Sequence, residues 1–124
     1  MSVRNDPVLR VVPAQRDINS NGHIFGGWVL SQMDIAGDII SKRVAQGPCA
    51  TVAINAMEFL APILVGDIIS VDGEVVKRGR TSLGIKLEVV ATRGVAQDQV
   101  KGTEELFTCV ALDEQHRPKA LPLA

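Results

Sequence analysis

The residues best suited to chemistry concentrate in the first third of the chain. A polar loop containing Asn19, Asn21 and His23 runs into Gly26 and Gly27, where a helix is expected to begin without a Ser, Thr or Asp cap. The first N–H groups of such a helix have no side-chain partner, and two glycines allow another molecule to approach them closely. Free N–H groups at the positive end of a helix dipole stabilise negative charge developing on an oxygen. A plain glycine-rich turn exposed to water is the alternative, and on this segment alone it is favoured.

Asp34 lies two turns further along the same helix, with apolar residues on both sides. We expect its carboxylate to be buried, and burying a carboxylate without partners is costly. This favours a general base or a nucleophile, with Asn19 or a bound water opposite it. The competing interpretation is a polar strip along the helix shared with Gln32 and Asp38, and the residues alone leave the two interpretations open.

Three further groups are weaker candidates. His23 is a possible acid–base group, although a single exposed loop histidine is more often inert. Cations and hydroxyls surround a tight turn and could hold a phosphate, although a solvated charged turn is commoner: Lys77, Arg78, Gly79, Arg80, Thr81 and Ser82. Arg117 and Lys119 near the C-terminus invite the same two interpretations, and Glu104 and Glu105 either line a cleft or face water.

Composition excludes several classes of function. The 124 residues suffice for one domain, taken as residues 1–124, and a net charge of −1 gives no general attraction for nucleic acid or an anionic membrane. No apolar run has the length of a membrane span or a secretory signal, so a cytoplasmic protein is expected. Cys49 and Cys109 lie in apolar runs and are predicted to be buried, reduced thiols. With two histidines and no CxxC motif, no metal site is expected.

Hydrophobic spacing predicts the elements that must position these residues. Apolar residues three and four apart predict a helix over residues 28–45 that is apolar on most of its circumference and therefore buried. Strands are predicted over residues 8–12, 50–60, 67–78, 81–92 and 100–112. The strands over 50–60 and 100–112 are expected to be the more fully buried. The expected fold class is α+β, with a curved antiparallel sheet wrapped around one long central helix. Because so small a domain leaves the helix and sheet edges incompletely covered, a dimer is favoured.

Taken together, the chain resembles the hot-dog fold acyl-CoA thioesterases, most closely their YciA-like branch. The specific part of the match is the run Asn-Ser-Asn-Gly-His-Ile-Phe-Gly-Gly-Trp at residues 19–28, followed by Ser31-Gln32-Met33-Asp34. Supporting matches are Phe59-Leu60-Ala61-Pro62, Val65-Gly66-Asp67, Gly79-Arg80-Thr81-Ser82 and the closing Arg117-Pro118-Lys119-Ala120-Leu121-Pro122. The resemblance extends from about Val8 to the end of the chain.

The resemblance implies a hydrolase of fatty acid metabolism that converts an acyl-CoA thioester to a free acid and coenzyme A. It implies that Asp34 is the catalytic carboxylate, as base or nucleophile, and that Asn19 is the loop amide acting across a homodimer interface. The N–H of Gly27 or a neighbour is expected to polarise the thioester carbonyl, and Gly26 is expected to be among the residues that bind coenzyme A. Coenzyme A is part of the substrate, and no separate cofactor or metal is implied.

The resemblance also implies a site for the nucleotide of coenzyme A at the subunit surface, formed by Arg78, Gly79, Arg80, Thr81 and Ser82 together with Lys119. Assembly as a hexamer, a trimer of dimers, is implied as well. His23 departs from the family pattern, in which a small acidic or amide residue is usual. Two alternatives of the same fold remain: a hydratase or dehydratase of acyl thioesters with His23 as its base, and a non-catalytic acyl-CoA sensor.

Overall fold

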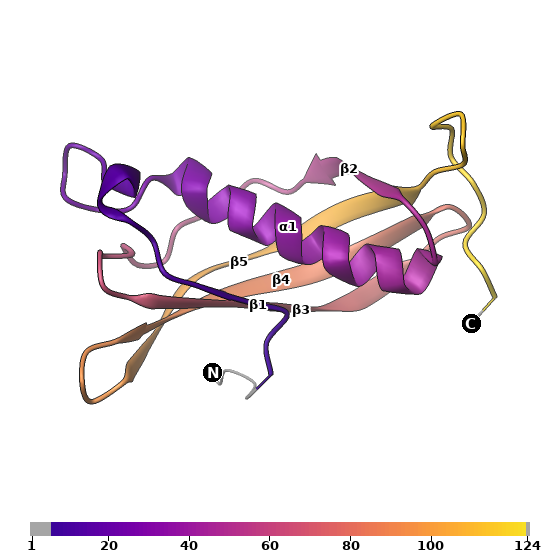
Figure 1. The fold of residues 1–124 in the computed structure, drawn as a ribbon. Coiled ribbons are helices and arrows are strands. Elements are labelled where there is room, and N and C mark those ends of the chain that lie inside the picture. Colours follow the sequence, from indigo (N-terminus) through magenta and orange to yellow (C-terminus); the bar gives the residue numbers. More distant parts are fainter. Residues whose placement is uncertain (1–5, 124) are drawn as a thin grey trace.

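The structure is a computed structural model that describes residues 6–123. One 20-residue helix, α1 (Gly26–Ala45), lies across the concave face of a curled five-stranded antiparallel sheet (Figure 1). The strands are β1 (Leu9–Val11), β2 (Cys49–Ile54), β3 (Ile68–Arg78), β4 (Ser82–Arg93) and β5 (Asp98–Ala111), in the spatial order β1-β3-β4-β5-β2. A 3₁₀ turn, η1 (Gln15–Asp17), precedes the helix. The predicted α+β arrangement is confirmed.

Helix α1 begins at Gly26, two residues before the predicted start, and its predicted apolar stripe faces the sheet. Val29, Met33, Ala36 and Ile40 are all buried in the core. The helix is nevertheless not covered on all sides, because Ile35 is 48% exposed. The expectation of a fully buried helix is therefore wrong for one chain, since the sheet covers only one side of α1.

The core forms where α1 rests on the central strands. Ile85 and Leu87 of β4 and Phe107 of β5 are fully buried. At Gly73 of β3, a Cβ atom would lie 2.6 Å from Leu87 Cδ2 and 3.2 Å from Ile40 Cδ1. The absence of a side chain there allows the C-terminal half of α1 to approach the sheet closely.

The predicted strand over residues 50–60 is only half right. β2 shifts register between Thr51 and Ala53 and ends at Ile54, and its outer residues are exposed because it is an edge strand. Residues 55–64 leave the sheet as an irregular segment that runs towards the N-terminal end of α1 (Figure 1). The burial expected of this strand is wrong, since no strand within the single chain covers its free side.

No helix among residues 6–123 has the length and hydropathy required to cross a bilayer.

Candidate active site

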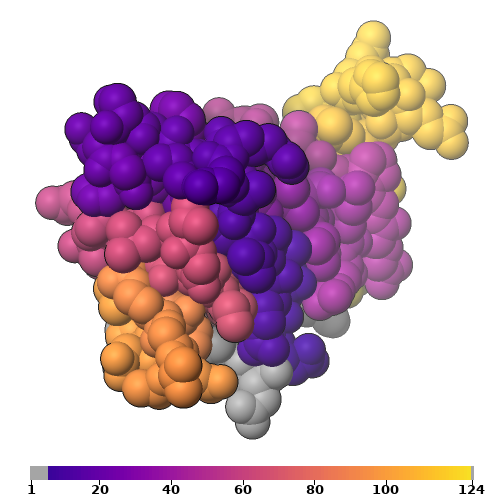
Figure 2. All heavy atoms as spheres, turned by 60° about the vertical axis from the view of Figure 1, so that its left-hand side comes forward, coloured from indigo at the N-terminus to yellow at the C-terminus, as the bar shows by residue number. Residues whose placement is uncertain are grey.

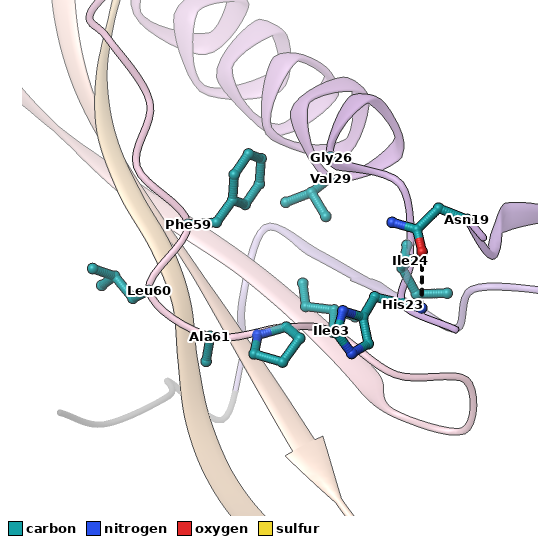
Figure 3. Close-up of a pocket in the computed structure, with 10 residues that line it drawn as sticks. Asn19, His23, Ile24, Gly26, Val29, Phe59, Leu60, Ala61 and Ile63 are labelled. Atoms are coloured by element: carbon teal, nitrogen blue, oxygen red, sulfur yellow. Dashed lines mark hydrogen bonds between the residues drawn. The ribbon is translucent and has the colours of Figure 1, made fainter. Parts of the chain in front are cut away.

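A cavity of about 390 Å³ lies at the N-terminal end of α1, between the loop that enters the helix and the segment after β2 (Figure 3). The entering loop supplies Asn19, His23 and Ile24, and the first turn supplies Gly26 and Val29; the opposite wall is formed by residues 59–63. The structure thus brings the predicted loop amide and the first glycine to one cavity. His23, expected to be exposed, is half-buried in its lining.

The oxygen and the nitrogen of the Asn19 side-chain amide have different roles. Its Oδ1 accepts hydrogen bonds from the N–H groups of Asn21 at 2.9 Å and His23 at 3.1 Å. Because backbone N–H groups can only donate, these bonds fix the orientation of the amide. The Nδ2 group is therefore turned towards Gly26 and Val29, and no acceptor for it occurs among residues 6–123 (Figure 3). Asn19 presents an N–H donor to the cavity, not a carbonyl.

The N-terminus of α1 is uncapped, as predicted. The N-cap residue, Phe25, makes no side-chain cap, and its carbonyl accepts the N–H groups of Trp28 at 3.1 Å and Val29 at 3.3 Å. Within the described part of the chain, nothing accepts a hydrogen bond from the N–H of Gly26 or Gly27. Two backbone donors at the positive end of the dipole are thus available to another molecule.

The two glycines have different surroundings. A Cβ on Gly26 would lie 2.9 Å from Cζ of Phe59, so the ring of Phe59 packs directly on this backbone. A Cβ on Gly27 would meet nothing within 4 Å. Neither the backbone conformation nor the packing of this chain requires a glycine at position 27, and the backbone there is open to an approach from outside the chain.

Asp34 lies apart from this cavity. Eight residues of helix separate it from Gly26, a rise of about 12 Å. Its carboxylate is exposed, contrary to the expectation of burial, because this side of α1 lies beyond the cover of the sheet, beside edge strand β2. Thr51 Oγ1 of β2 donates a hydrogen bond to Asp34 Oδ1 at 2.6 Å. No local pattern in the sequence marks Thr51, since 17 residues separate it from Asp34.

The neighbours of Asp34 distinguish it from Asp38. Asp38 pairs with Lys42 at 2.9 Å, one turn along the helix, as a surface ion pair. Behind Thr51 lies Cys109, with Sγ 3.8 Å from Oγ1, and burial raises the pKa of the Cys109 thiol. Both cysteines are free as predicted; Cys109 is buried, while Cys49 is only half-buried.

The predicted phosphate-binding turn lies at the opposite end of α1. Gly79 N–H bonds the Ser82 carbonyl at 2.8 Å to close the β3–β4 turn, in which Thr81 also lies. The C-terminal segment packs against this turn: Leu121 N–H donates to the Arg80 carbonyl at 2.8 Å, and the Arg78 guanidinium donates to the Pro122 carbonyl. Lys119, on the same segment, bonds the Ala111 carbonyl through its N–H at 2.9 Å. The predicted cations therefore gather here, about 30 Å along the helix from the glycines.

Glu104 and Glu105 belong to neither region. Glu104 accepts Lys101 at 2.5 Å and Lys86 at 3.1 Å, and these cations lower its pKa to about 2. Glu105 Oε1 accepts the N–H of Leu106 at 2.9 Å. Across residues 6–123, no group of three or more His, Cys, Asp or Glu side chains is arranged to hold a metal ion.

Comparisons with known proteins place the chain in a family. The model of the Thioesterase superfamily matches residues 21–96. The acyl-CoA thioester hydrolase YciA of Escherichia coli K12 is 44% identical over 124 residues, spanning 97% of this chain and 93% of the relative. A hexameric thioesterase from Yersinia pestis superposes with a TM-score of 0.91 at 41% identity, covering 98% of this chain and 100% of that one. A hexameric hotdog fold thioesterase of Campylobacter jejuni superposes with a TM-score of 0.89 at 33% identity, covering 95% and 91%. The chain belongs to the thioesterase superfamily and has its hot-dog fold.

Proposed function

We propose that the protein hydrolyses acyl-CoA thioesters to a free carboxylic acid and coenzyme A. The observation that carries this proposal is the convergence of unpaired donors, the Asn19 Nδ2 and the N–H groups of Gly26 and Gly27, on one end of the helix. A thioester carbonyl bound among them gains hydrogen bonds that strengthen as its oxygen becomes negative. The name of the E. coli relative, an acyl-CoA thioester hydrolase, supports this choice of substrate.

We further propose that each site forms between two copies of the chain. Asp34 lies about 12 Å along the helix from the glycines of its own chain, too far to serve a carbonyl bound there. The surface around it, on α1 and edge strand β2, is apolar and open: Ile35, Val52 and Ile54 are between 38% and 59% exposed. A second copy related by a two-fold axis would cover this surface and place Asp34 of the partner subunit opposite the glycines.

In this mechanism the carbonyl is polarised by Asn19 and by the N–H of Gly27. The carboxylate of Asp34 of the partner subunit removes a proton from water as the water oxygen adds to the carbonyl carbon. Collapse of the tetrahedral intermediate breaks the C–S bond, and the sulfur of coenzyme A leaves with the proton. The alternative is direct attack by the carboxylate on the carbonyl carbon, which breaks the C–S bond, expels the thiolate of coenzyme A and forms an anhydride that water then hydrolyses to the two carboxylic acids. In either case the hydrogen bond from Thr51 holds Oδ1 and leaves Oδ2 for the reaction.

The remaining assignments are part of the same proposal. The turn of Arg78, Gly79, Arg80, Thr81 and Ser82, with Lys119, would bind the phosphates of coenzyme A, since arginine and lysine side chains and N–H groups are typical phosphate ligands. The solved relatives from Yersinia pestis and Campylobacter jejuni are hexameric, which supports assembly as a trimer of dimers. We treat residues 1–124 as one domain and propose that no metal or separate cofactor is required.

The proposal is tested by measuring thiol release from short, medium and long acyl-CoAs. The wild type should release thiol, and Asp34→Ala should lose about 10²–10⁴-fold in kcat, the usual contribution of a positioned base. Asp38→Ala is the matched control, since this carboxylate lies one turn away but pairs with Lys42, and it should keep its activity. Retention of most activity by Asp34→Ala would exclude the assigned role. Release of no thiol from any substrate would favour a non-catalytic acyl-CoA sensor.

A second candidate, a hydratase or dehydratase of acyl thioesters, follows from the position of His23 in the cavity lining. Such an enzyme would use the imidazole as its base. His23→Ala separates the two candidates: a thioesterase should lose little activity, whereas a hydratase should lose most of it.

A further inference from the structure

An ion pair between the buried Asp67 and the partly exposed Arg93, whose side chain is 33% exposed, lies behind the cavity wall formed by residues 59–63. Asp67 is 1% exposed, and its carboxylate accepts Arg93 Nε at 2.9 Å, Arg93 Nη2 at 2.8 Å and the Leu64 N–H at 2.9 Å. Both oxygens are therefore engaged, and the guanidinium binds in a two-pronged geometry that fixes direction as well as distance. The pair joins the end of β4 to the turn before β3.

Arg93 also holds the wall directly. Its Nη2 donates to the Pro62 carbonyl at 3.1 Å, and the next carbonyl, that of Ile63, accepts the N–H of Ile24 at 2.9 Å. Ile24 lies in the loop that carries Asn19 into the helix. One chain of contacts therefore runs from Arg93 through Pro62 and Ile63 to the loop of the site. Figure 2 shows this end of the molecule, with the entering loop above the segment after β2 and the β4–β5 hairpin below it.

The other end of the wall is held independently. The hydroxyl of Thr103 donates to the Glu58 carbonyl at 2.8 Å, and the Leu60 N–H donates to the Gly102 carbonyl at 2.8 Å. Thr103 and Gly102 both lie on β5. Loss of Arg93 would consequently free the Pro62 carbonyl and loosen the wall between two attached ends: residues 58–60 stay bonded to β5, and Leu64 stays bonded to Asp67.

We propose that Arg93 is a positioning residue for the thioester site: through Asp67 and Pro62 it holds the 59–63 wall against the N-terminus of α1 and sets the place of Asn19 and of the free N–H groups. Arg93 does not line the cavity, so it acts through the wall and not on the substrate. A partly exposed ion pair adds little net stability, whereas its bidentate geometry fixes the direction of the guanidinium, which suits this role. The inference rests on the proposed function.

The test compares Arg93→Met and Arg93→Lys with the control Lys101→Met, which removes a cation from another ion-pair network, outside the cavity. The first readout is amide hydrogen exchange at Ile24, which does not depend on activity. Exchange at Ile24 should accelerate at least about tenfold in Arg93→Met. The acceleration should be smaller in Arg93→Lys, which keeps one charged contact, and exchange should remain at the wild-type rate in the control.

The second readout compares the effect on kcat with the effect on the binding of the product, coenzyme A. In Arg93→Met, kcat should fall about tenfold or more, because small displacements of positioning groups are costly. Inhibition by free coenzyme A should not change, since its phosphates are proposed to bind at the far turn. Unchanged exchange at Ile24, or unchanged kcat with accelerated exchange, overturns the inference. Should the wild type release no thiol, the proposed function fails, while exchange at Ile24 still decides whether Arg93 holds the wall.

Discussion

The two ends of α1 are finished in opposite ways. At the C-terminal end, Gln46 adopts a left-handed conformation and its N–H bonds the Lys42 carbonyl at 2.8 Å, while Lys42 and Arg43 complement the dipole. At the N-terminal end, no side chain caps the helix and the N–H groups of Gly26 and Gly27 have no partner in the described chain. The C-terminal end is therefore capped, whereas the N-terminal end leaves backbone N–H groups unpaired beside a cavity.

This difference locates function within a regular fold. An uncapped helix end forgoes about 1 kcal/mol relative to a capped one, which selection for stability alone would remove. The same argument applies to Gly27, which helix propensity disfavours and the packing of this chain does not require. Chemistry is therefore expected at the end of α1 where the local sequence is less stabilising. Substitutions at the two ends should accordingly differ in their effects on activity and stability.

Among substitutions near the two ends of α1, the largest effect is expected at Asn19. Asn19→Asp keeps the oxygen that accepts the N–H groups of Asn21 and His23 but removes the Nδ2 donor. Thiol release should fall at least about 10²-fold in kcat, with the melting temperature close to that of the wild type. Asn19→Ala loses both functions and should also lose about 1 kcal/mol of stability. If Asn19→Asp hydrolyses acyl-CoA at the normal rate, the donor role of this amide is wrong.

A smaller effect is expected from the glycine pair. Gly27→Ala should leave the fold intact or stabilise it by up to about 1 kcal/mol, yet lower kcat/KM roughly tenfold by obstructing the approach of substrate. Gly26→Ala should displace the ring of Phe59, which lies 2.9 Å from the added Cβ, and lower the free energy of unfolding by about 1 kcal/mol, because this ring is 50% exposed and can move aside. Denaturant unfolding and initial rates on both variants distinguish the two. Full activity in Gly27→Ala would mean that nothing approaches this open backbone.

Acid should loosen the N-terminal end first. Hydrogen bonds from Arg93 and Leu64 hold the pKa of Asp67 below its ordinary value of 3.8 in spite of the desolvation caused by burial. A lowered folded pKa means that the stabilisation is complete above about pH 4 and is lost as the pH falls below that value. Fluorescence of Trp28, in the first turn of α1, should change before the far-ultraviolet circular dichroism. Asp67→Asn should abolish this early phase, and Glu104→Gln, on the outer face of the sheet, should not; an identical acid profile for all three proteins would contradict the role of Asp67.

The smallest effect is expected at the C-terminal end. Gln46 has a φ of 56°, a conformation that glycine adopts without penalty. Gln46→Gly should therefore raise stability by up to about 1 kcal/mol and leave thiol release unchanged. A substantial change in kcat would contradict the prediction that the C-terminal end of α1 affects stability and not activity.

Periodicity predicted the elements well and the surroundings of the site poorly. The spacing of Val29, Met33, Ala36 and Ile40 identified the buried face of α1, because a helix repeats its faces every 3.6 residues. The same pattern could not show that the side bearing Asp34 is left open by the single chain. An apolar residue fills a core and an interface between copies equally well.

Contacts distant in sequence were the other limit. Thr51 lies 17 residues from Asp34, and Arg93 lies 26 residues from Asp67. Neither pair is marked by local spacing, since the curvature and register of the sheet bring them together. The chemistry of the loop residues Asn19 and Gly26 is local and visible in the sequence, whereas Thr51 and Arg93, which hold Asp34 and the cavity wall, lie on β2 and β4.

The central claim is that Asn19 of one chain works with Asp34 of another. Co-expression of equal amounts of Asn19→Asp and Asp34→Ala, each inactive alone, should produce mixed assemblies in which about a quarter of the sites are intact, because a two-fold dimer of unlike chains has one unaltered and one doubly altered site. Thiol release should recover to about a quarter of the wild-type rate. Mixed assemblies that remain as inactive as the separate variants would contradict the claim.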